Sequence, residues 1–241
     1  FTGLKFDPFA HTSYLYGESL ASDLGLTSAQ QDHAFNISRA VREAVGPDFD
    51  IMIETHAMLN YRVAVKMAQR LSALDITWYE EPAGPESADN LRAMRERIPS
   101  NVSICVGERH YTRHGIRPVL EKNICDIMMP DITRCGGPSE MKRMATIMEA
   151  YNVLLAPHNP NGPLSTIASA HVCAAVPNFF RQEYMFNDVE WRDTVITHPI
   201  KDMIRNGHLE LSERPGLGVD LVEHEMEKHP GILIPKEGFY I

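Results

Sequence analysis

Short apolar segments and longer amphipathic segments alternate along most of this chain, and no other feature constrains its fold as strongly. The apolar segments predict β-strands, and the segments between them carry apolar residues at helical spacing. The predicted strands are 3–6, 49–54, 76–79, 102–106, 124–129, 153–156 and 179–183. The predicted helices are 27–45, 61–74, 87–97, 114–122, 138–151 and 164–176. This alternation predicts an α/β protein with a parallel sheet and right-handed crossovers.

Two architectures show this alternation, an open doubly wound sheet and a (β/α)8-type barrel. An open sheet usually carries a glycine-rich phosphate loop after a strand, and the sequence has neither GxGxxG nor GxxxxGK[ST]. Barrel active sites draw residues from the carboxyl ends of several strands. Ionisable residues stand at these ends throughout the sequence, which favours the barrel. They are Lys5, Asp7, Glu54, His56, Glu80, Glu81, Glu108, Asp131, His158 and Glu183.

Length, charge and composition limit the partners and the cellular location to be expected for such a barrel. The length of 241 residues is close to the roughly 250 that a barrel needs. The formal net charge of −9 gives little electrostatic support for a nucleic-acid partner. No apolar run approaches the roughly 20 residues of a membrane span, and the four cysteines form no CxxC pair. We therefore expect a cytoplasmic protein with reduced thiols and no membrane partner.

Three glutamates predict a metal site. Glu54, Glu80 and Glu108 follow three successive predicted strands at intervals of 26 and 28 residues. A single glutamate at a strand end is usually a solvated loop residue, but three at equivalent places would crowd together and repel unless a cation lay between them. Oxygen ligands suit a hard ion, so the sequence predicts bound Mg²⁺.

Two histidines lie where proton transfer would be needed. His56 follows Glu54 by two residues, so strand alternation predicts that both side chains face the metal. His56 could be a ligand, but a site built from oxygen ligands favours an acid or base role. His158 and Asp131 end neighbouring predicted strands, and a carboxylate beside an imidazole gives it the tautomer and basicity of a general base. A lone histidine is more often structural, and we assign most of the others to surface or packing roles.

Several short segments, taken together and in order, resemble the enolase superfamily. The resemblance is to the mandelate racemase/muconate lactonizing enzyme-like branch, and it is nearest to the galactonate and gluconate dehydratase-like acid-sugar dehydratases. It spans most of residues 1–193. The segments are Ile53-Glu54-Thr55-His56, Trp78-Tyr79-Glu80-Glu81-Pro82, Gly107-Glu108-Arg109, Pro130-Asp131, Gly136-Gly137 and Ala156-Pro157-His158-Asn159-Pro160.

The resemblance implies a hydro-lyase that converts an aldonate or aldarate to a 2-keto-3-deoxy acid. In that group Mg²⁺ binds the substrate carboxylate and stabilises an enediolate, and the glutamates of this sequence match its ligands. His158, paired with Asp131, matches the base that removes the α-proton, and His56 matches the general acid on the departing 3-hydroxyl. Glu183 matches a residue that hydrogen-bonds the substrate near the developing oxyanion.

We expect substrate contacts from five further residues, some with a plain alternative. They are Lys5, Asp7, Arg109, Asn159 and Trp191. Arg109 could instead pair with neighbouring carboxylates, Asn159 belongs to strong turn chemistry, and a tryptophan at 191 is more often a packing residue.

The sequence departs from the family pattern at two places that affect its function. Glu54 stands where Asp is common in the superfamily. Lys5-Phe6-Asp7 stands where members with two bases often carry Lys-x-Lys, which weakens a racemase interpretation. A racemase, epimerase or cycloisomerase that uses the same enolate chemistry is the main alternative. A barrel that binds metal without catalysis is a further one.

The resemblance also predicts the domain organisation. Residues 1–193 are expected to form the catalytic barrel from its second strand onward, and residues 194–241 a C-terminal tail that packs toward an N-terminal α+β capping domain. The cap and the first barrel strand are not found in this sequence, so we expect it to be part of a longer protein. We also expect a homo-oligomer that acts on a small-molecule acid sugar.

Overall fold

Six parallel strands form the main sheet of this protein, in the order β1-β2-β3-β4-β5-β6. The computed structural model describes residues 1–9, 26–185 and 189–230. Each strand pairs in parallel with its neighbour in sequence, which requires a long crossover between every two strands. The strands are β1 (Gly3–Phe6), β2 (Asp50–Glu54), β3 (Trp78–Glu80), β4 (Ile104–Val106), β5 (Ile127–Met128) and β6 (Leu154–Leu155).

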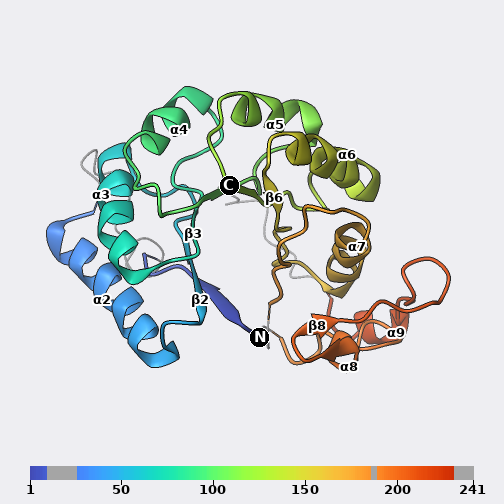
Figure 1. Cartoon of the computed structure of the whole chain (residues 1–241). Helices are drawn as coiled ribbons and strands as arrows, with labels where there is room; N and C mark the ends of the chain where they lie inside the picture. The colour runs from blue at the N-terminus through green and yellow to red at the C-terminus, as the bar shows by residue number, and fades with distance from the viewer. Residues whose placement is uncertain (10–25, 186–188, 231–241) are drawn as a thin grey trace, which may run out of the picture.

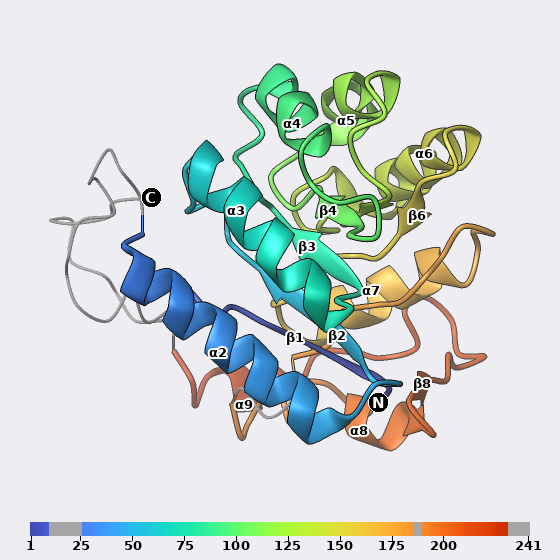
Figure 2. The same ribbon diagram turned by 60° about the vertical axis from the view of Figure 1, so that its left-hand side comes forward.

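Helices supply these crossovers and lie outside the strands in an arc (Figure 1). Among the described residues, the crossover helices are α2 (Ser28–Val45), α3 (Tyr61–Leu71), α4 (Ala88–Arg95), α5 (Thr112–Glu121) and α6 (Gly137–Ala150), with a 3₁₀ turn, η1 (Ser72–Leu74), after α3. A further helix, α7 (Pro163–Cys173), follows β6. Figure 2 shows α2 and α3 lying along the outer side of the sheet. A parallel sheet curved inside a layer of helices is part of a (β/α)8 barrel, which confirms the predicted fold class.

Local sequence signals explain where several helices begin. The Thr27 hydroxyl accepts the backbone N–H of Gln30, and the Gln30 side chain accepts the backbone N–H of Thr27, which completes a capping box at α2. Asn60 caps α3 and Ser87 caps α4 through their side-chain oxygens. These caps satisfy backbone donors that a helix start leaves unpaired.

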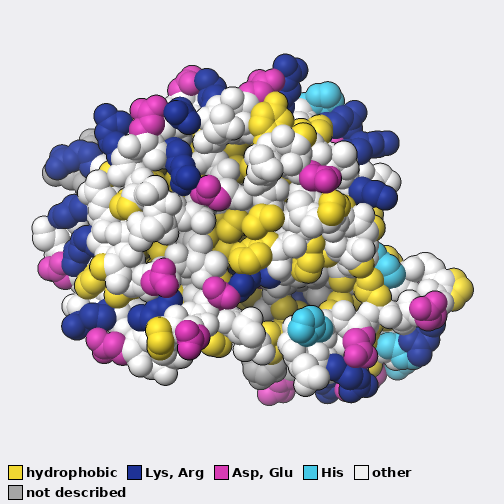
Figure 3. Space-filling view, viewed as in Figure 1, with side chains coloured by type: hydrophobic (Ala, Val, Ile, Leu, Met, Phe, Trp, Pro, Cys, Tyr) yellow, Lys and Arg dark blue, Asp and Glu magenta, His cyan; other side chains and the backbone are white. Residues whose placement is uncertain are grey.

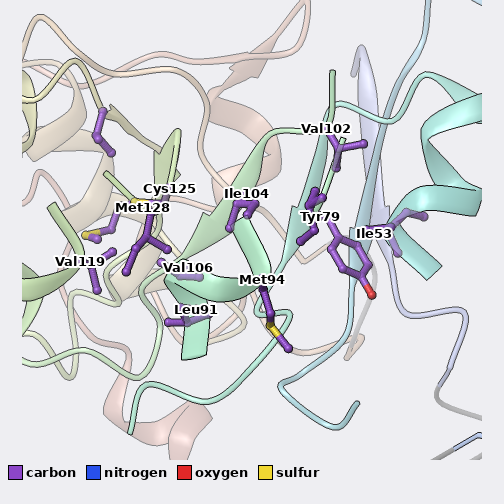
Figure 4. Close-up of a cluster of buried hydrophobic side chains, with 14 of the residues drawn as sticks. Ile53, Tyr79, Leu91, Met94, Val102, Ile104, Val106, Val119, Cys125 and Met128 are labelled. Carbon is purple, nitrogen blue, oxygen red and sulfur yellow. The ribbon is translucent and has the colours of Figure 1, made fainter. Parts of the chain in front are cut away.

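The main core lies between the sheet and the helices. Strand residues alternate between two faces, so Ile53 and Tyr79 point outward to the helices, where Leu91 and Met94 of α4 join the same buried cluster (Figure 4). The alternate residues form a second buried cluster on the inner face. Its members are Met52, Trp78, Cys105, Ile127, Met129 and Ala156. Figure 3 shows hydrophobic side chains filling the middle of the arc, with charged groups mostly around its edge.

The prediction of a seventh strand at residues 179–183 was wrong. This segment makes one parallel bridge, between Leu155 and Phe179. The Leu155 N–H donates to the Asn178 carbonyl and the Phe180 N–H donates to the Leu155 carbonyl. The next donor in that ladder would be residue 157, which is proline and has no N–H. The ladder therefore stops after one step.

The part of the predicted C-terminal tail that the structure describes packs on α7. It contains α8 (Ile200–Met203), β7 (Ile204–Arg205), β8 (His208–Leu209) and α9 (Glu223–Met226). Ile167 of α7 forms a third buried cluster with Val195, Ile196 and Ile200. The expected contact of this tail with a capping domain stays a prediction. None of the helices in the described ranges is both long and apolar enough to cross a bilayer.

Candidate metal and proton-transfer site

Three glutamates converge where the middle strands end. Glu54 ends β2 and is the register partner of Glu80, which ends β3, and Glu108 follows β4 by two residues. All three are buried. One ligand oxygen from each lies within 4.8 Å of the others, so the predicted convergence is confirmed.

The surroundings of Glu54 fit a cation. Its Oε1 accepts the backbone N–H groups of Thr55 and His56, at 2.9 Å and 2.6 Å. Its Oε2 is buried and has no hydrogen-bond partner among the described residues, with the Lys5 ammonium 3.5 Å away. An unpaired buried carboxylate oxygen is costly. With the carboxylates of Glu80 and Glu108 beside it, this oxygen belongs to a ligand set that suits a hard divalent ion.

Glu80 is a second buried carboxylate whose negative charge is poorly compensated. Burial raises the pKa of Glu80 well above its usual range, the Lys5 ammonium opposes that rise, and the neighbouring Glu54 adds to it. The Glu80 oxygens accept the Lys5 Nζ at 2.6 Å and the Trp78 Nε1 at 2.8 Å. Trp78 was not among the predicted site residues, although its place two residues before Glu80 predicts the same face of β3.

Lys5, an expected substrate contact, lies among these acids. Its Nζ is 2.6 Å from Glu80 and 2.8 Å from Glu183. Burial lowers the pKa of Lys5, but the charges of Glu80, Glu183 and Glu54 outweigh burial and raise it above its ordinary value. Lys5 is therefore a fixed positive charge beside the three glutamates. The other oxygen of Glu183 accepts the Asn159 backbone N–H at 2.6 Å.

His158 lies between two carboxylates. Its Nδ1 is 2.8 Å from Asp131 and its Nε2 is 2.9 Å from Glu108. Burial lowers the pKa of His158, but the hydrogen bonds to Asp131 and Glu108 outweigh burial and raise it to about 9. For Glu108 the effects are reversed. Burial raises its pKa, but the hydrogen bond and charge of His158, together with the charge of Arg109, outweigh burial and lower it to about 2. The predicted pairing of His158 with Asp131 is thus present in the structure.

Asp131 is itself held by two neighbours that were not among the predicted site residues. Its Oδ1 accepts the backbone N–H and the hydroxyl of Thr133, at 2.8 Å and 2.6 Å. Its Oδ2 accepts the side-chain amide of Asn161 at 2.8 Å, beside His158. Asn161 comes from the turn that follows His158. Its position three residues after the predicted base was the available signal.

His56 forms a second histidine–carboxylate pair, with Asp7. The His56 Nδ1 lies 2.7 Å from the Asp7 Oδ2. This hydrogen bond raises the pKa of His56, against partial burial, and Glu54 adds to the rise. Strand alternation does not explain the position of His56, because β2 ends at Glu54 and the His56 backbone is left-handed with φ 50°. Asp7, expected at the substrate, contacts the predicted acid instead.

The Arg109 guanidinium pairs with carboxylates, which was the alternative to a substrate contact. Its Nη1 lies 2.5 Å from Glu108 and 3.1 Å from Glu81, and its Nη2 donates to the His56 carbonyl at 3.2 Å. The other Glu81 oxygen accepts the Gly107 N–H at 2.7 Å. Burial raises the pKa of Glu81 to about 7. Glu81 and Arg109 thus support the loop that carries Glu108.

The last two expected substrate residues have partners within the chain. Asn159 is fully buried, and its side-chain amide bonds to Thr166, Ser165 and the Glu183 carbonyl. That amide therefore holds the turn together. Trp191 is 39% exposed and stacks on His229, with ring centroids 4.2 Å apart.

The fold and the carboxylate cluster define a class of protein, and sequence comparison agrees with them. The sequence model of the enolase C-terminal domain-like family matches residues 1–225. The chain belongs to this family of the enolase superfamily. The resemblance to mandelate racemase/muconate lactonizing enzyme-like proteins is thereby confirmed.

Individual relatives are similar over most of this chain. The D-xylonate dehydratase of Haloferax volcanii is 35% identical over 85% of this chain and 48% of its own length. The D-gluconate/D-galactonate dehydratase of Picrophilus torridus is 31% identical over 95% of this chain and 55% of its own. A mandelate racemase/muconate lactonizing enzyme-like crystal structure from Rubrobacter xylanophilus matches with a TM-score of 0.87 and 34% identity, over 99% of this chain and 59% of that one. The chain spans about half the length of the curated relatives it matches.

Proposed function

We propose that the protein containing this chain is a Mg²⁺-dependent hydro-lyase that dehydrates an aldonate or aldarate to a 2-keto-3-deoxy acid. The observation that carries the proposal is the trio of buried glutamates flanked by two histidine–carboxylate pairs. The His158–Asp131 pair contacts Glu108, and the His56–Asp7 pair contacts Glu54. Curated relatives named as dehydratases of D-xylonate, D-gluconate and D-galactonate support the same reaction class.

The metal would occupy the position between the three carboxylates. Glu54, Glu80 and Glu108 would hold Mg²⁺, which when bound supplies positive charge against the substrate carboxylate and against the negative charge that develops as the α-proton leaves. Lys5 adds a fixed positive charge beside the same position, and Glu183 holds Lys5 there.

His158 is the proposed base. Asp131 accepts from Nδ1, so Nε2 is the nitrogen left for the α-proton. In this structure Nε2 contacts Glu108 at 2.9 Å, and it would be free to accept the α-proton when Glu108 instead holds Mg²⁺. Thr133 and Asn161 hold the Asp131 carboxylate and thereby fix the orientation of the ring. An oriented imidazole of this kind contributes about 10²- to 10⁴-fold in rate as a general acid or base.

His56 is the proposed acid for the departing 3-hydroxyl. It reaches the site from the β2 end, whereas His158 follows β6. A separate base and acid let one histidine accept the α-proton while the other delivers a proton to the leaving oxygen. The net reaction then removes one water molecule from carbons 2 and 3 of the substrate.

One alternative reaction has specific support. The D-galactarolactone cycloisomerase of Agrobacterium fabrum is 30% identical over 76% of this chain. An epimerase, racemase or cycloisomerase would use the same proton abstraction without loss of water. A barrel that binds metal without catalysis is less well supported, because the proposed base and its carboxylate partner are in hydrogen-bond contact.

The two reactions are separated by following candidate substrates in D₂O by NMR. The protein with Mg²⁺ is incubated with D-xylonate, D-gluconate, D-galactonate and a panel of aldarates. Dehydration predicts a 2-keto-3-deoxy acid that carries deuterium at carbon 3. Deuterium at carbon 2 without loss of water would instead establish epimerisation or racemisation. No reaction with any acid of a broad panel would contradict the proposal.

The setting of the protein is also a proposal. We propose a cytoplasmic homo-oligomer that acts on a small molecule, without a nucleic-acid partner. The net charge of −9 and the four free, buried cysteines support this setting. Light scattering coupled to size-exclusion chromatography tests the oligomeric state, and a monomeric mass for the whole protein would contradict it.

A further inference from the structure

We propose that Asp7 is a positioning residue that orients the His56 ring and fixes Nε2 as its proton-delivering atom. This inference deepens the proposed function and rests on it for the role of His56. From the sequence, Asp7 was expected to contact the substrate. In the structure its carboxylate instead bonds to the His56 ring and to the Phe9 backbone.

Both oxygens of Asp7 are already used within the chain. Oδ1 accepts the backbone N–H of Phe9 at 2.6 Å, and Oδ2 lies 2.7 Å from the His56 Nδ1. The Asp7 side chain is only 10% exposed. A carboxylate with this little exposure and two short hydrogen bonds is poorly suited to bind a substrate that is itself an anion.

The direction of the hydrogen bond fixes the tautomer. A carboxylate can only accept, so the His56 Nδ1 carries the hydrogen. Nε2 makes no hydrogen bond within the described part of the chain, and the His56 side chain is 40% exposed. Nε2 is therefore the nitrogen available to a bound molecule.

The backbone of His56 is held as firmly as its ring. Its N–H donates to the Glu54 Oε1 at 2.6 Å, and its carbonyl accepts from the Arg109 Nη2 at 3.2 Å. His56 and Ala57 both have left-handed backbones, with φ of 50° and 57°. Two successive non-glycine residues in this conformation carry strain, which persists only where the surroundings impose it. The fold thus places the His56 ring at one point, and Asp7 sets its rotation.

The same arrangement, an aspartate that accepts from the Nδ1 of a histidine, recurs at the proposed base. The His158 Nδ1 lies 2.8 Å from Asp131, and Asp131 is held by the Thr133 backbone as Asp7 is held by that of Phe9. In both pairs the supporting N–H comes from the residue two positions after the aspartate. Both aspartates lie just beyond their strands, β1 and β5. Each proposed proton-transfer histidine therefore has its own orienting carboxylate.

The first test needs no substrate. ¹⁵N-histidine NMR of the intact protein should show a downfield Nδ1–H resonance that disappears in His56→Gln, which assigns it to His56. The resonance should be lost or exchange-broadened in Asp7→Ala and retained in Asp48→Asn, a change at an exposed acid before β2. An unaltered His56 resonance in a folded Asp7→Ala variant would overturn the proposal. Asp7→Leu, which keeps most of the side-chain volume but cannot accept a hydrogen bond, replaces Asp7→Ala if the latter fails to fold.

The second test is a double-mutant cycle on the acid sugar that is turned over. Asp7→Ala should lower kcat by about 10- to 100-fold, with KM changed by less than about threefold. In a His56→Gln background the same change should have less than about a twofold effect, because Asp7 acts through His56. A large rise in KM, or equal effects in both backgrounds, would show that Asp7 contacts the substrate directly. If no acid sugar is turned over, the proposed function fails while the NMR result still decides whether Asp7 orients His56.

Discussion

At the scale of single residues, His158 has the environment that most clearly departs from an ordinary surface histidine. Asp131 and Glu108 bind its two ring nitrogens, at 2.8 Å and 2.9 Å. Asparagine in its place could still donate to Asp131 but could not accept a proton. The change therefore removes the base and leaves the anchoring contact in place.

His158→Asn should lower kcat by on the order of 10²- to 10⁴-fold, because it removes general-base catalysis. It should also abolish exchange of the substrate α-hydrogen with D₂O, measured by proton NMR. His33→Asn, at an exposed position of α2, is the matched control and should leave both rates unchanged. Exchange at the wild-type rate in His158→Asn would assign the base to another residue.

The residues that could be predicted from the sequence are those whose place follows from strand ends alone. Glu54 and Glu80 end successive strands and Glu108 follows the next strand by two residues, so parallel pairing suffices to bring them together. The contact between Asp7 and His56 could not be foreseen from alternation. It depends on a left-handed turn after β2 that the local sequence does not specify.

At the scale of elements, the contacts of Arg42 explain how α2 joins its neighbours. Its guanidinium donates to the carbonyls of Leu74 at 2.9 Å, Phe49 at 2.6 Å and Asp75 at 2.8 Å. It also donates to the Gly46 carbonyl at the end of its own helix, at 2.8 Å. One side chain therefore ties the end of α2 to the loop that precedes β2 and to the loop between α3 and β3.

Arg42→Met should lower the free energy of unfolding by about 1.5–3 kcal/mol, because it keeps most of the side-chain length but leaves several carbonyls without their charged donor. Urea denaturation, with an unchanged m-value, measures the loss. Arg39→Met, one turn earlier on α2, is the control, since Arg39 makes an exposed 3.9 Å ion pair with Glu43. It should change stability by less than about 1 kcal/mol, and equal losses in the two variants would contradict this account of Arg42.

The positions of the elements were more predictable than their lengths. The predicted helix 27–45 agrees with α2, which Thr27 caps and which ends at Val45. The predicted strand 124–129 contracts to β5 (Ile127–Met128), because apolar residues that precede a strand in a buried loop look the same in sequence. The segment 179–183 was predicted as a strand from its own residues, whereas Pro157 on its neighbour ends the ladder.

At the scale of the whole molecule, side chains connect the two ends of the described arc. Arg181 bonds to Asp50 of β2 at 2.6 Å, and Phe1 stacks on Tyr184 with ring centroids 6.2 Å apart. Partial burial raises the pKa of Asp50, but hydrogen bonds from Arg181 and Thr77 outweigh it and lower the pKa below its ordinary value. A carboxyl group with a lowered pKa stabilises the folded state only when it is ionised.

The stability lost in Asp50→Asn should therefore depend on pH in one direction. The difference from the wild type should be constant above about pH 5, where Asp50 is ionised in both folded and unfolded states. It should shrink as the pH falls below about 3.9 and toward the lower pKa of the folded state. Urea denaturation at a series of pH values measures this, and a difference that grows on acidification would contradict the proposed ion pair.

The central claim is that Glu54, Glu80 and Glu108 together hold one divalent cation, and calorimetric titration of the metal-free protein with Mg²⁺ tests it most directly. We predict one bound ion per chain in the wild type and loss of that binding in Glu80→Gln. Glu86→Gln, at an exposed glutamate in the loop after β3, should bind as the wild type does. Unchanged Mg²⁺ binding in Glu80→Gln, or no binding to the wild type, would contradict the claim.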